Sequence, residues 1–435
     1  MLRWVFPRVY EGWIVVGASG MTVLIIAASF FYGFGTIFTE VIDEFGWSVA
    51  ATSLAFSLRS EVGGLAAPFV GVLIDRIGAQ IVIVGGIVIV VAGVLGMSFI
   101  QEIWHFYVAM IVIAIGTSAA GGQVGLAAIA TWFERRRARA MSFMTVGGGL
   151  GGLLVVLIAW MVEQVGWRDA LRILAFFMAT VGTLIALNIR ARPLDHPQPM
   201  DGLTYVEQTG INPAPAIRWG IPWRKVLRTR SFIFVSLGLV AISYATTSVV
   251  VHQIPYLERD LDVSKALAGA TVAVFTVASI VGRLGFGILA DRYPKRWMMA
   301  WASVPVAAGL PFLIWGDSMA MALIGILLIA PGFGGVIPVR PAMLADYYGT
   351  RYFGTINGMA ALVTTTGGAL GPWLVGRLVD QTGNYDQGWI TCGVATLISI
   401  PLFILATPPD DLVEEYRGQV HGEIADVRAS LLDAH

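Results

Sequence analysis

Hydrophobic residues in this chain are gathered into long runs that short polar breaks separate. Most runs reach about 18 residues or more, and at a rise of about 1.5 Å per residue each can cross about 30 Å of hydrocarbon. We expect helices, because lipid offers no hydrogen-bond partner to the edges of open strands. The pattern predicts twelve spans, at about residues 13–38, 48–74, 80–100, 104–132, 139–164, 168–190, 232–257, 265–290, 296–315, 319–346, 353–380 and 388–407.

The composition supports an all-α membrane protein and excludes several other classes. Hydrophobic residues make up 57% of the chain and charged residues 13%, whereas a soluble domain carries about 25% charged residues. The formal net charge is zero, so we expect no nucleic-acid partner. Cys392 is the one cysteine, which excludes an intrachain disulfide and a cysteine metal cluster. We expect neither a metal nor another cofactor.

Basic residues in the loops predict the orientation of the chain, since Lys and Arg favour the cytoplasmic side. With both termini cytoplasmic, that side holds Arg3, Arg8, Arg76, Arg135, Arg136, Arg137, Arg139, Arg292, Lys295, Arg296, Arg351 and the basic cluster in 218–230. The opposite side carries mainly acidic residues. We expect a multi-pass protein of the plasma membrane or bacterial inner membrane.

A long polar interruption at residues 191–231 divides the twelve spans into six and six. Its repeated prolines exclude a long helix, and its aromatic and basic end, 219–228, suits the cytoplasmic headgroup level. The sequence therefore predicts the following organisation: an N-terminal six-helix bundle at 1–190, a cytoplasmic linker at 191–231, a C-terminal six-helix bundle at 232–407 and a mobile polar cytoplasmic tail at 408–435.

The two halves share motifs at matching positions, as an internal repeat requires. Residues 71–76 end in Asp75-Arg76 and residues 287–292 end in Asp291-Arg292, an offset of 291 − 75 = 216. Residues 145–151 are similarly echoed by residues 365–371. The glycines 147–149 follow no strand, so close helix packing explains them better than phosphate binding.

The paired Gly-x-x-x-Asp-Arg motifs and the repeated six-helix layout resemble the major facilitator superfamily. The resemblance implies two pseudo-symmetric bundles that rock against each other, with each motif acting as a cytoplasmic latch. We expect Asp75 and Asp291 to pair with an arginine of their own or a neighbouring helix, with Arg76 and Arg292 as gating residues. The alternative is a pair of charged turns that only follow the loop charge bias.

Ionisable residues inside predicted spans are costly and mark candidate sites. They are Arg59, Glu61, His252, Arg283 and, near the cytoplasmic rim, Arg340. Arg283 lies 8 residues before Asp291, about 12 Å inward from the helix end. A guanidinium at that depth suits the carboxylate of a small organic anion. A structural salt bridge to another helix is the alternative.

Two segments resemble the signatures of monocarboxylate transporters and of the related bacterial oxalate/formate antiporters. They are Tyr10-Glu11-Gly12-Trp13 and the run at 132–140 that leads into Gly147–Gly151. The resemblance implies that Arg283 binds the substrate carboxylate. The lysines that these families carry on the first or the eleventh span are missing, since no lysine occurs in 13–44 or 353–376. The aspartate that proton-coupled members carry one turn before the arginine is also missing, and Ser279 stands in its place. A dicarboxylate that needs two cations is therefore not favoured.

The remaining polar residues of the spans have less certain roles. Glu61 is a candidate proton-coupling acid if it is partly desolvated, and Arg59 a candidate outer gate; interhelical bonds that lock one conformation are the alternative. His252 can bind or gate, or serve only in packing. Tyr32, Gln123 and Asn357 are further candidate substrate contacts on helices of the central cavity.

Together these features predict a secondary active transporter of a small organic anion, a monocarboxylate, that works by alternating access. Protons or a counter-anion would be the coupled partner, and a monomer in the bilayer fits. An exporter of lipophilic or cationic compounds is an alternative, although Glu61 is its one available buried acid. A membrane sensor with a carrier fold is another. The sequence has no nucleophile with a base at readable spacing, so we do not expect an enzyme.

Overall fold

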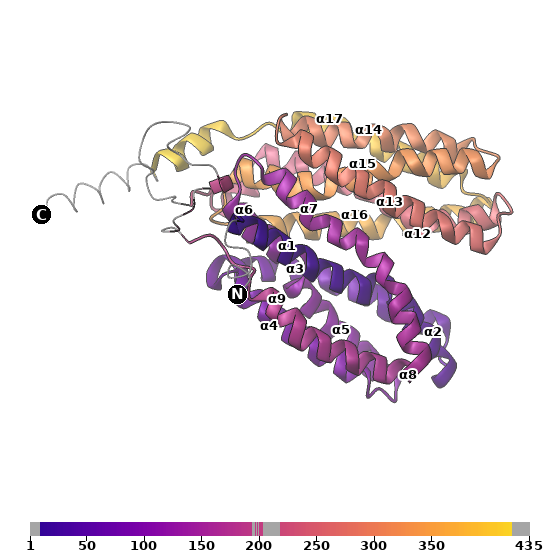
Figure 1. Cartoon of the computed structure of the whole chain (residues 1–435). Coiled ribbons are helices and arrows are strands. Elements are labelled where there is room, and N and C mark those ends of the chain that lie inside the picture. The colour runs from indigo at the N-terminus through magenta and orange to yellow at the C-terminus, as the bar shows by residue number, and fades with distance from the viewer. Residues whose placement is uncertain (1–8, 194–195, 197, 199, 203–217, 420–435) are drawn as a thin grey trace, which may run out of the picture.

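The structure, a computed structural model, describes residues 9–193, 196, 198, 200–202 and 218–419 (Figure 1). The described residues are almost entirely helical. The first part contains α1 (Glu11–Ile26), the π-helical η2 (Ala27–Tyr32), α2 (Phe34–Phe45), α3 (Val49–Ile77), α4 (Ala79–Met97), α5 (Ile103–Ala120), α6 (Gly122–Trp132), α7 (Arg137–Leu150), η3 (Gly151–Leu154), α8 (Val155–Phe177), the π-helical η4 (Met178–Gly182) and α9 (Thr183–Ala186). The second contains η5 (Met200–Gly202), α11 (Trp223–Val226), α12 (Arg230–Arg259), α13 (Lys265–Ala290), α14 (Lys295–Ile314), α15 (Met319–Tyr348), α16 (Phe353–Thr382) and α17 (Asp386–Leu405).

These elements make the twelve predicted passes. Nine helical stretches of the described residues are long and apolar enough to cross a membrane. One of them, Arg137–Ala186, contains two passes, because Gly166 has a φ of 77° and interrupts the helix there. The more polar α3 and α16 complete the set. They pack against each other across the two halves, so part of their surface meets protein and not lipid.

The helices form two bundles that meet at one end of the molecule. In Figure 1 the N-terminal bundle, in indigo and magenta, and the C-terminal bundle, in orange and yellow, converge toward the side where α1 begins and α17 ends, and spread apart at the other. We call the converging side, which includes Asp75, Asp291 and Tyr348, the terminal end. The side that includes Gly46 and Asp317 is the distal end. The halves contact each other through α3 with α16 and through α7 with α13 and α15.

Close helix packing depends on glycines, as the sequence predicted for Gly147. A Cβ on Gly147 would lie 2.1 Å from the carbonyl oxygen of Gly20, so α1 and α7 approach backbone to backbone. The same is true between the halves, where a Cβ on Gly71 would lie 2.2 Å from the carbonyl oxygen of Gly354. Small residues therefore set how closely the two bundles can approach at the terminal end.

The segment after α17 differs from the mobile polar tail that we expected. Residues 410–419 form a helix that lies on the end of the linker. Lys225 Nζ is 3.7 Å from a carboxylate oxygen of Glu415 and 5.1 Å from the ring centre of Tyr416, and Arg417 lies over the ring of Trp219 at 4.6 Å. Aromatic and basic residues of the linker thus hold the tail helix. Residues 420–435 lie outside the described part.

Candidate functional site

Asp75 connects the two halves at the terminal end. Its carboxylate accepts hydrogen bonds from the backbone amides of Gly354 and Thr355, both at 2.8 Å, and from the Thr355 hydroxyl at 2.6 Å. These amides form the first turn of α16, where unpaired N–H groups and the helix dipole favour an anion. The latch partner of Asp75 is therefore a helix N-terminus and not the arginine that we expected.

Asp291 repeats this contact in the opposite direction. Its carboxylate accepts from the amides of Ala138 at 2.9 Å and Arg139 at 3.3 Å, in the first turn of α7, and lies 3.6 Å from the Arg139 guanidinium. Here one arginine does take part, although the backbone supplies the shorter bonds. Burial raises the pKa of Asp291 to about 6, against the opposing effect of these hydrogen bonds. Arg76 and Arg292, the other gating candidates, are exposed.

A third contact between the halves was missed in the sequence. Arg137, which is 5% exposed, forms an ion pair with Asp346 of α15, and Lys295 pairs with the same carboxylate. One carboxylate thus holds a cation from each half. The arginine run at 135–137 pointed to the cytoplasmic side, but its charge alone does not show that one member turns inward.

Arg283 lies at the interface of the bundles, seven residues before the end of α13. Its side chain is 8% exposed, and Nη1 donates a hydrogen bond to the backbone carbonyl oxygen of Thr145 in α7. A Cβ on Gly148 would lie 3.5 Å from the same nitrogen, so a glycine leaves room beside the guanidinium. A cation of the C-terminal half therefore meets the backbone of the N-terminal half in mid-protein.

Arg340 does not lie at the rim, where we placed it, but lines a cavity of about 120 Å³ between α12, α15 and α16. Its Nη1 is 3.3 Å from the hydroxyl oxygen of Thr364. Ser243 and Thr247 add hydroxyl groups to the lining, and Phe333 adds an aromatic wall. The cavity thus combines one cation with several neutral hydrogen-bonding groups.

Of the weaker candidates, His252 and Gln123 have partners within their own halves. The imidazole of His252 lies 2.9 Å from the carbonyl oxygen of Pro372 and 3.2 Å from the Tyr385 hydroxyl, the environment of a satisfied packing histidine. Gln123 donates to the carbonyl oxygen of Ala67 at 2.8 Å. The contacts of His252 support its packing alternative, and that of Gln123 engages its amide within the N-terminal half.

The other candidates give a mixed result. Asn357 is fully buried in α16. Glu61 is exposed and not enclosed by neighbouring helices, and Arg59 is half-buried. The side chain of Tyr32 lies outside the described residues. Proton coupling at Glu61 and gating at Arg59 remain predictions.

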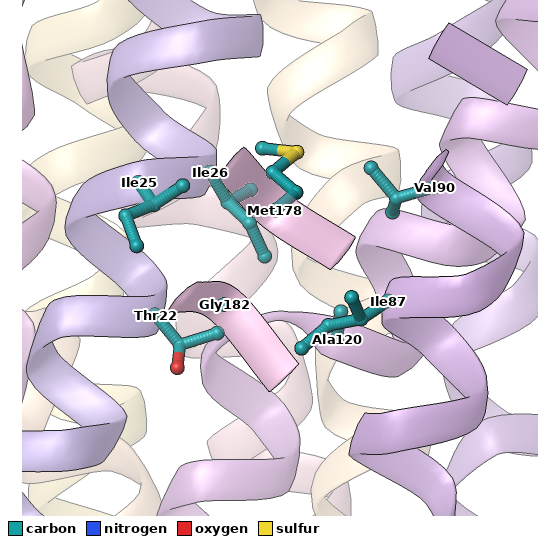
Figure 2. Close-up of a pocket in the computed structure, with 8 residues that line it drawn as sticks. All are labelled: Thr22, Ile25, Ile26, Ile87, Val90, Ala120, Met178 and Gly182. Carbon is teal, nitrogen blue, oxygen red and sulfur yellow. The ribbon is translucent and has the colours of Figure 1, made fainter. Parts of the chain in front are cut away.

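A second cavity, of about 20 Å³, lies inside the N-terminal half between α1, α4, α5 and η4 (Figure 2). Figure 2 shows that Ile25, Ile26, Val90 and Met178 point into it, and that Thr22 carries the one side-chain oxygen among the labelled residues. That hydroxyl donates to the carbonyl oxygen of Ala18 at 3.0 Å. We assign this space to helix packing because it presents nothing for a polar solute.

The twelve passes, the repeated latch and the buried cations between the halves agree with the sequence profile of the Major Facilitator Superfamily, which matches residues 20–253 and 234–432. The chain belongs to the Major Facilitator Superfamily. It is therefore a transporter and a multi-pass integral membrane protein, not an enzyme, and the resemblance on which we based the fold is confirmed.

Similar proteins within the family include monocarboxylate transporters and efflux proteins. Monocarboxylate transporter 13 of Rattus norvegicus is 25% identical, over 93% of this chain and 93% of its own. Monocarboxylate transporter 12 of Homo sapiens is 24% identical, over 89% and 79%. The aspyridones efflux protein apdF of Emericella nidulans is 26% identical, over 73% of this chain and 61% of its own.

Among solved structures, the family transporter FucP in the outward conformation has a TM-score of 0.71 at 13% identity, covering 91% of this chain and 99% of its own. The human organic anion transporter MFSD10 has a TM-score of 0.65 at 15% identity, covering 92% and 100%. At these identities the similarity shows the fold alone.

Proposed function

We propose that this protein is a secondary active transporter of a small organic anion that it binds through a carboxylate. Monocarboxylates are the class that the names of several relatives indicate. The observation that carries the proposal is Arg283, a guanidinium at mid-depth that spans from the C-terminal half to the backbone of the N-terminal half. Inside a membrane protein an ionisable residue in this position is a functional-site candidate by default, and a guanidinium suits a carboxylate.

The contacts of Arg283 suggest how binding couples to alternating access. Without a ligand, the guanidinium donates to the neutral carbonyl oxygen of Thr145. A carboxylate accepts stronger, bidentate hydrogen bonds from arginine and would replace this carbonyl. Substrate binding would then remove one contact between the halves while the latches at Asp75 and Asp291 still close the terminal end. Energy comes from a proton gradient or from exchange with a second anion.

The charges of the loops favour one orientation of the protein in the membrane. With both termini in the cytoplasm, the terminal end is the cytoplasmic side, and the structure corresponds to a state closed to the cytoplasm. The plasma membrane or the bacterial inner membrane is the expected location.

Export is the second candidate, because the relative apdF is named an efflux protein. An exporter of cationic compounds would need buried acids facing the substrate, and Glu61 is exposed here. An exporter of organic anions would instead use the same Arg283. Uptake and efflux assays on protein of known orientation distinguish these directions.

The central test is transport of lactate and pyruvate into proteoliposomes under an imposed pH gradient or with anion-loaded vesicles. Arg283→Ala should reduce uptake about 30-fold or more, since loss of one partner from a buried charge pair costs at least about 2 kcal/mol. Arg283→Lys should retain part of the activity, because the charge stays but the bidentate geometry is lost. Arg377→Ala, at an exposed arginine near the distal end, is the matched control.

Unchanged thermal unfolding of Arg283→Ala would show that the variant is folded. Uptake of carboxylates by this folded variant at the rate of the unmodified protein would refute the proposal.

A further inference from the structure

The cavity around Arg340 has the composition of an anion-binding pocket. Arg340 approaches it from α15, Thr364 from α16, and Ser243 and Thr247 from α12. At about 120 Å³ it can hold several waters or a carboxylate group with its neighbouring carbons. The hydroxyl groups of Ser243 and Thr247 can donate to carboxylate oxygens, and the guanidinium adds charge to the same contact, whereas the hydroxyl of Thr364 already donates to the carbonyl oxygen of Ala360.

Two buried polar groups, one at this cavity and one two turns from it along α16, lack hydrogen-bond partners within the described part of the chain. The Nε of Arg340 is buried with no hydrogen-bond acceptor, and neither side-chain atom of Asn357 has a partner although the residue is 0% exposed. Asn357 precedes Thr364 by seven residues, two turns of α16, so both face the same way, with Asn357 nearer the terminal end. Buried polar groups are normally hydrogen-bonded, so the Nε of Arg340 can donate to a ligand in the cavity, whereas Asn357 does not line it.

The two buried arginines of the C-terminal half lie at similar depths. Arg340 is 8 residues from Tyr348 at the end of α15, and Arg283 is 7 residues from Ala290 at the end of α13, which places their Cα atoms about 12 and 10 Å from the terminal end. The two helices are in direct contact, since a Cβ on Gly334 would lie 2.0 Å from a backbone oxygen of α13. Arg283 meets the N-terminal half, whereas Arg340 faces the cavity.

We propose that Arg340 and the hydroxyl groups of Ser243 and Thr247 form a second anion subsite, which binds a second carboxylate of the substrate while Arg283 binds the first. This inference rests on the proposed binding of a carboxylate at Arg283, and it assigns small dicarboxylates as the preferred substrates in place of the monocarboxylates that the names of the relatives indicate. It replaces our expectation from the sequence, which looked for a second cation on the first or eleventh span. The second cation is on the tenth span instead.

The test compares succinate with butyrate, which differ by a carboxylate in place of a methyl group. Binding is measured as ligand-induced stabilisation of the purified, full-length protein against thermal unfolding, and transport is measured in proteoliposomes. The unmodified protein should bind succinate about 10- to 100-fold more tightly than butyrate, the contribution of a hydrogen bond to a charged group. Arg340→Gln should remove this preference and leave butyrate affinity unchanged.

Thr247→Val provides a second variant in case Arg340→Gln fails to fold. It keeps the shape of the side chain but removes a hydroxyl group from the lining of the cavity, so it should weaken succinate binding and spare butyrate. Arg377→Gln is the control at an exposed arginine.

Equal affinity of the unmodified protein for the two acids, or retention of the preference by the folded variants, would overturn the subsite. If succinate binds with the predicted preference but no carboxylate is transported, the subsite is supported and the proposed transport function is wrong.

Discussion

The ionisation of Asp291 should control how firmly the terminal end is closed. Burial raises the pKa of this carboxyl group from 3.8 to about 6, outweighing the hydrogen bonds from Ala138 and Arg139 and the nearby charges of Lys295 and Arg139. When the halves separate, water reaches the group and its pKa returns toward its ordinary value. The closed state then binds the proton more tightly than the open state. Closure is therefore stabilised as the pH falls from about 6 to 4 and weakened as the pH rises through 6.

The magnitude follows from the difference between the two pKa values. About two pH units correspond to about 3 kcal/mol, an upper bound that would change the ratio of closed to open protein roughly 100-fold. Asp291→Asn carries a neutral amide at every pH, so its ratio of closed to open protein should stay at the low-pH value throughout. Asp291→Ala removes the hydrogen-bond acceptor and should favour opening at every pH.

The assay is a distance measurement between spin labels on Asp43→Cys and Asp317→Cys. Both positions are exposed, and they lie at the distal ends of opposite halves. Cys392, the one cysteine of the chain, is replaced by alanine in this background. Closure of the terminal end appears as a larger fraction of long distances at pH 5 than at pH 7. If Asp291→Asn shows the same pH dependence as the unmodified residue, the reasoning is wrong, because another group then controls the transition.

Two further predictions concern the contact between the halves. A Cβ on Gly287 would lie 1.5 Å from a serine hydroxyl oxygen of α7, whereas a Cβ on Gly285 would meet nothing within 4 Å. Gly287→Ala should therefore open the terminal end in the same distance assay. The control is Gly285→Ala, and an equal effect of this substitution would contradict the prediction. Asp346→Asn leaves the buried Arg137 without its carboxylate and should destabilise the protein by about 3–5 kcal/mol. Calorimetry measures this loss of unfolding free energy. Removing the exposed partner of Lys225 should cost less than about 1 kcal/mol. A loss as small as that for Asp346→Asn would count against the prediction.

Hydropathy was sufficient to predict the membrane-spanning helices, because the length of an apolar run shows whether the segment can cross a membrane. The predicted span 265–290 coincides with α13 (Lys265–Ala290), and 353–380 differs from α16 (Phe353–Thr382) by two residues at one end. The tail was predicted less well. Its acidic residues indicated solvent, but the aromatic and basic partners at Trp219 and Lys225 precede it by about 190 residues in the sequence.

The partners of the candidate site residues could not be predicted from the sequence. Helix rise placed Arg283 near mid-protein, yet its contact with the carbonyl oxygen of Thr145 depends on how two distant helices cross. The same limit applies to Asp75, whose partners are backbone amides that have no sequence signature. For Arg340, position along the helix could not show that its side chain turns into a cavity lined by two other helices.

The paired latches have a consequence for how this architecture can arise. The aspartate ending the second pass of one half, α3, binds the start of the fifth pass of the other, α16, and α13 with α7 returns the same contact. Each bundle thus offers one acceptor and one set of donors, which is the self-complementary exchange of an isologous homodimer. Two copies of a single six-helix unit would already carry both halves of this contact, so covalent fusion adds a linker but requires no new interface chemistry.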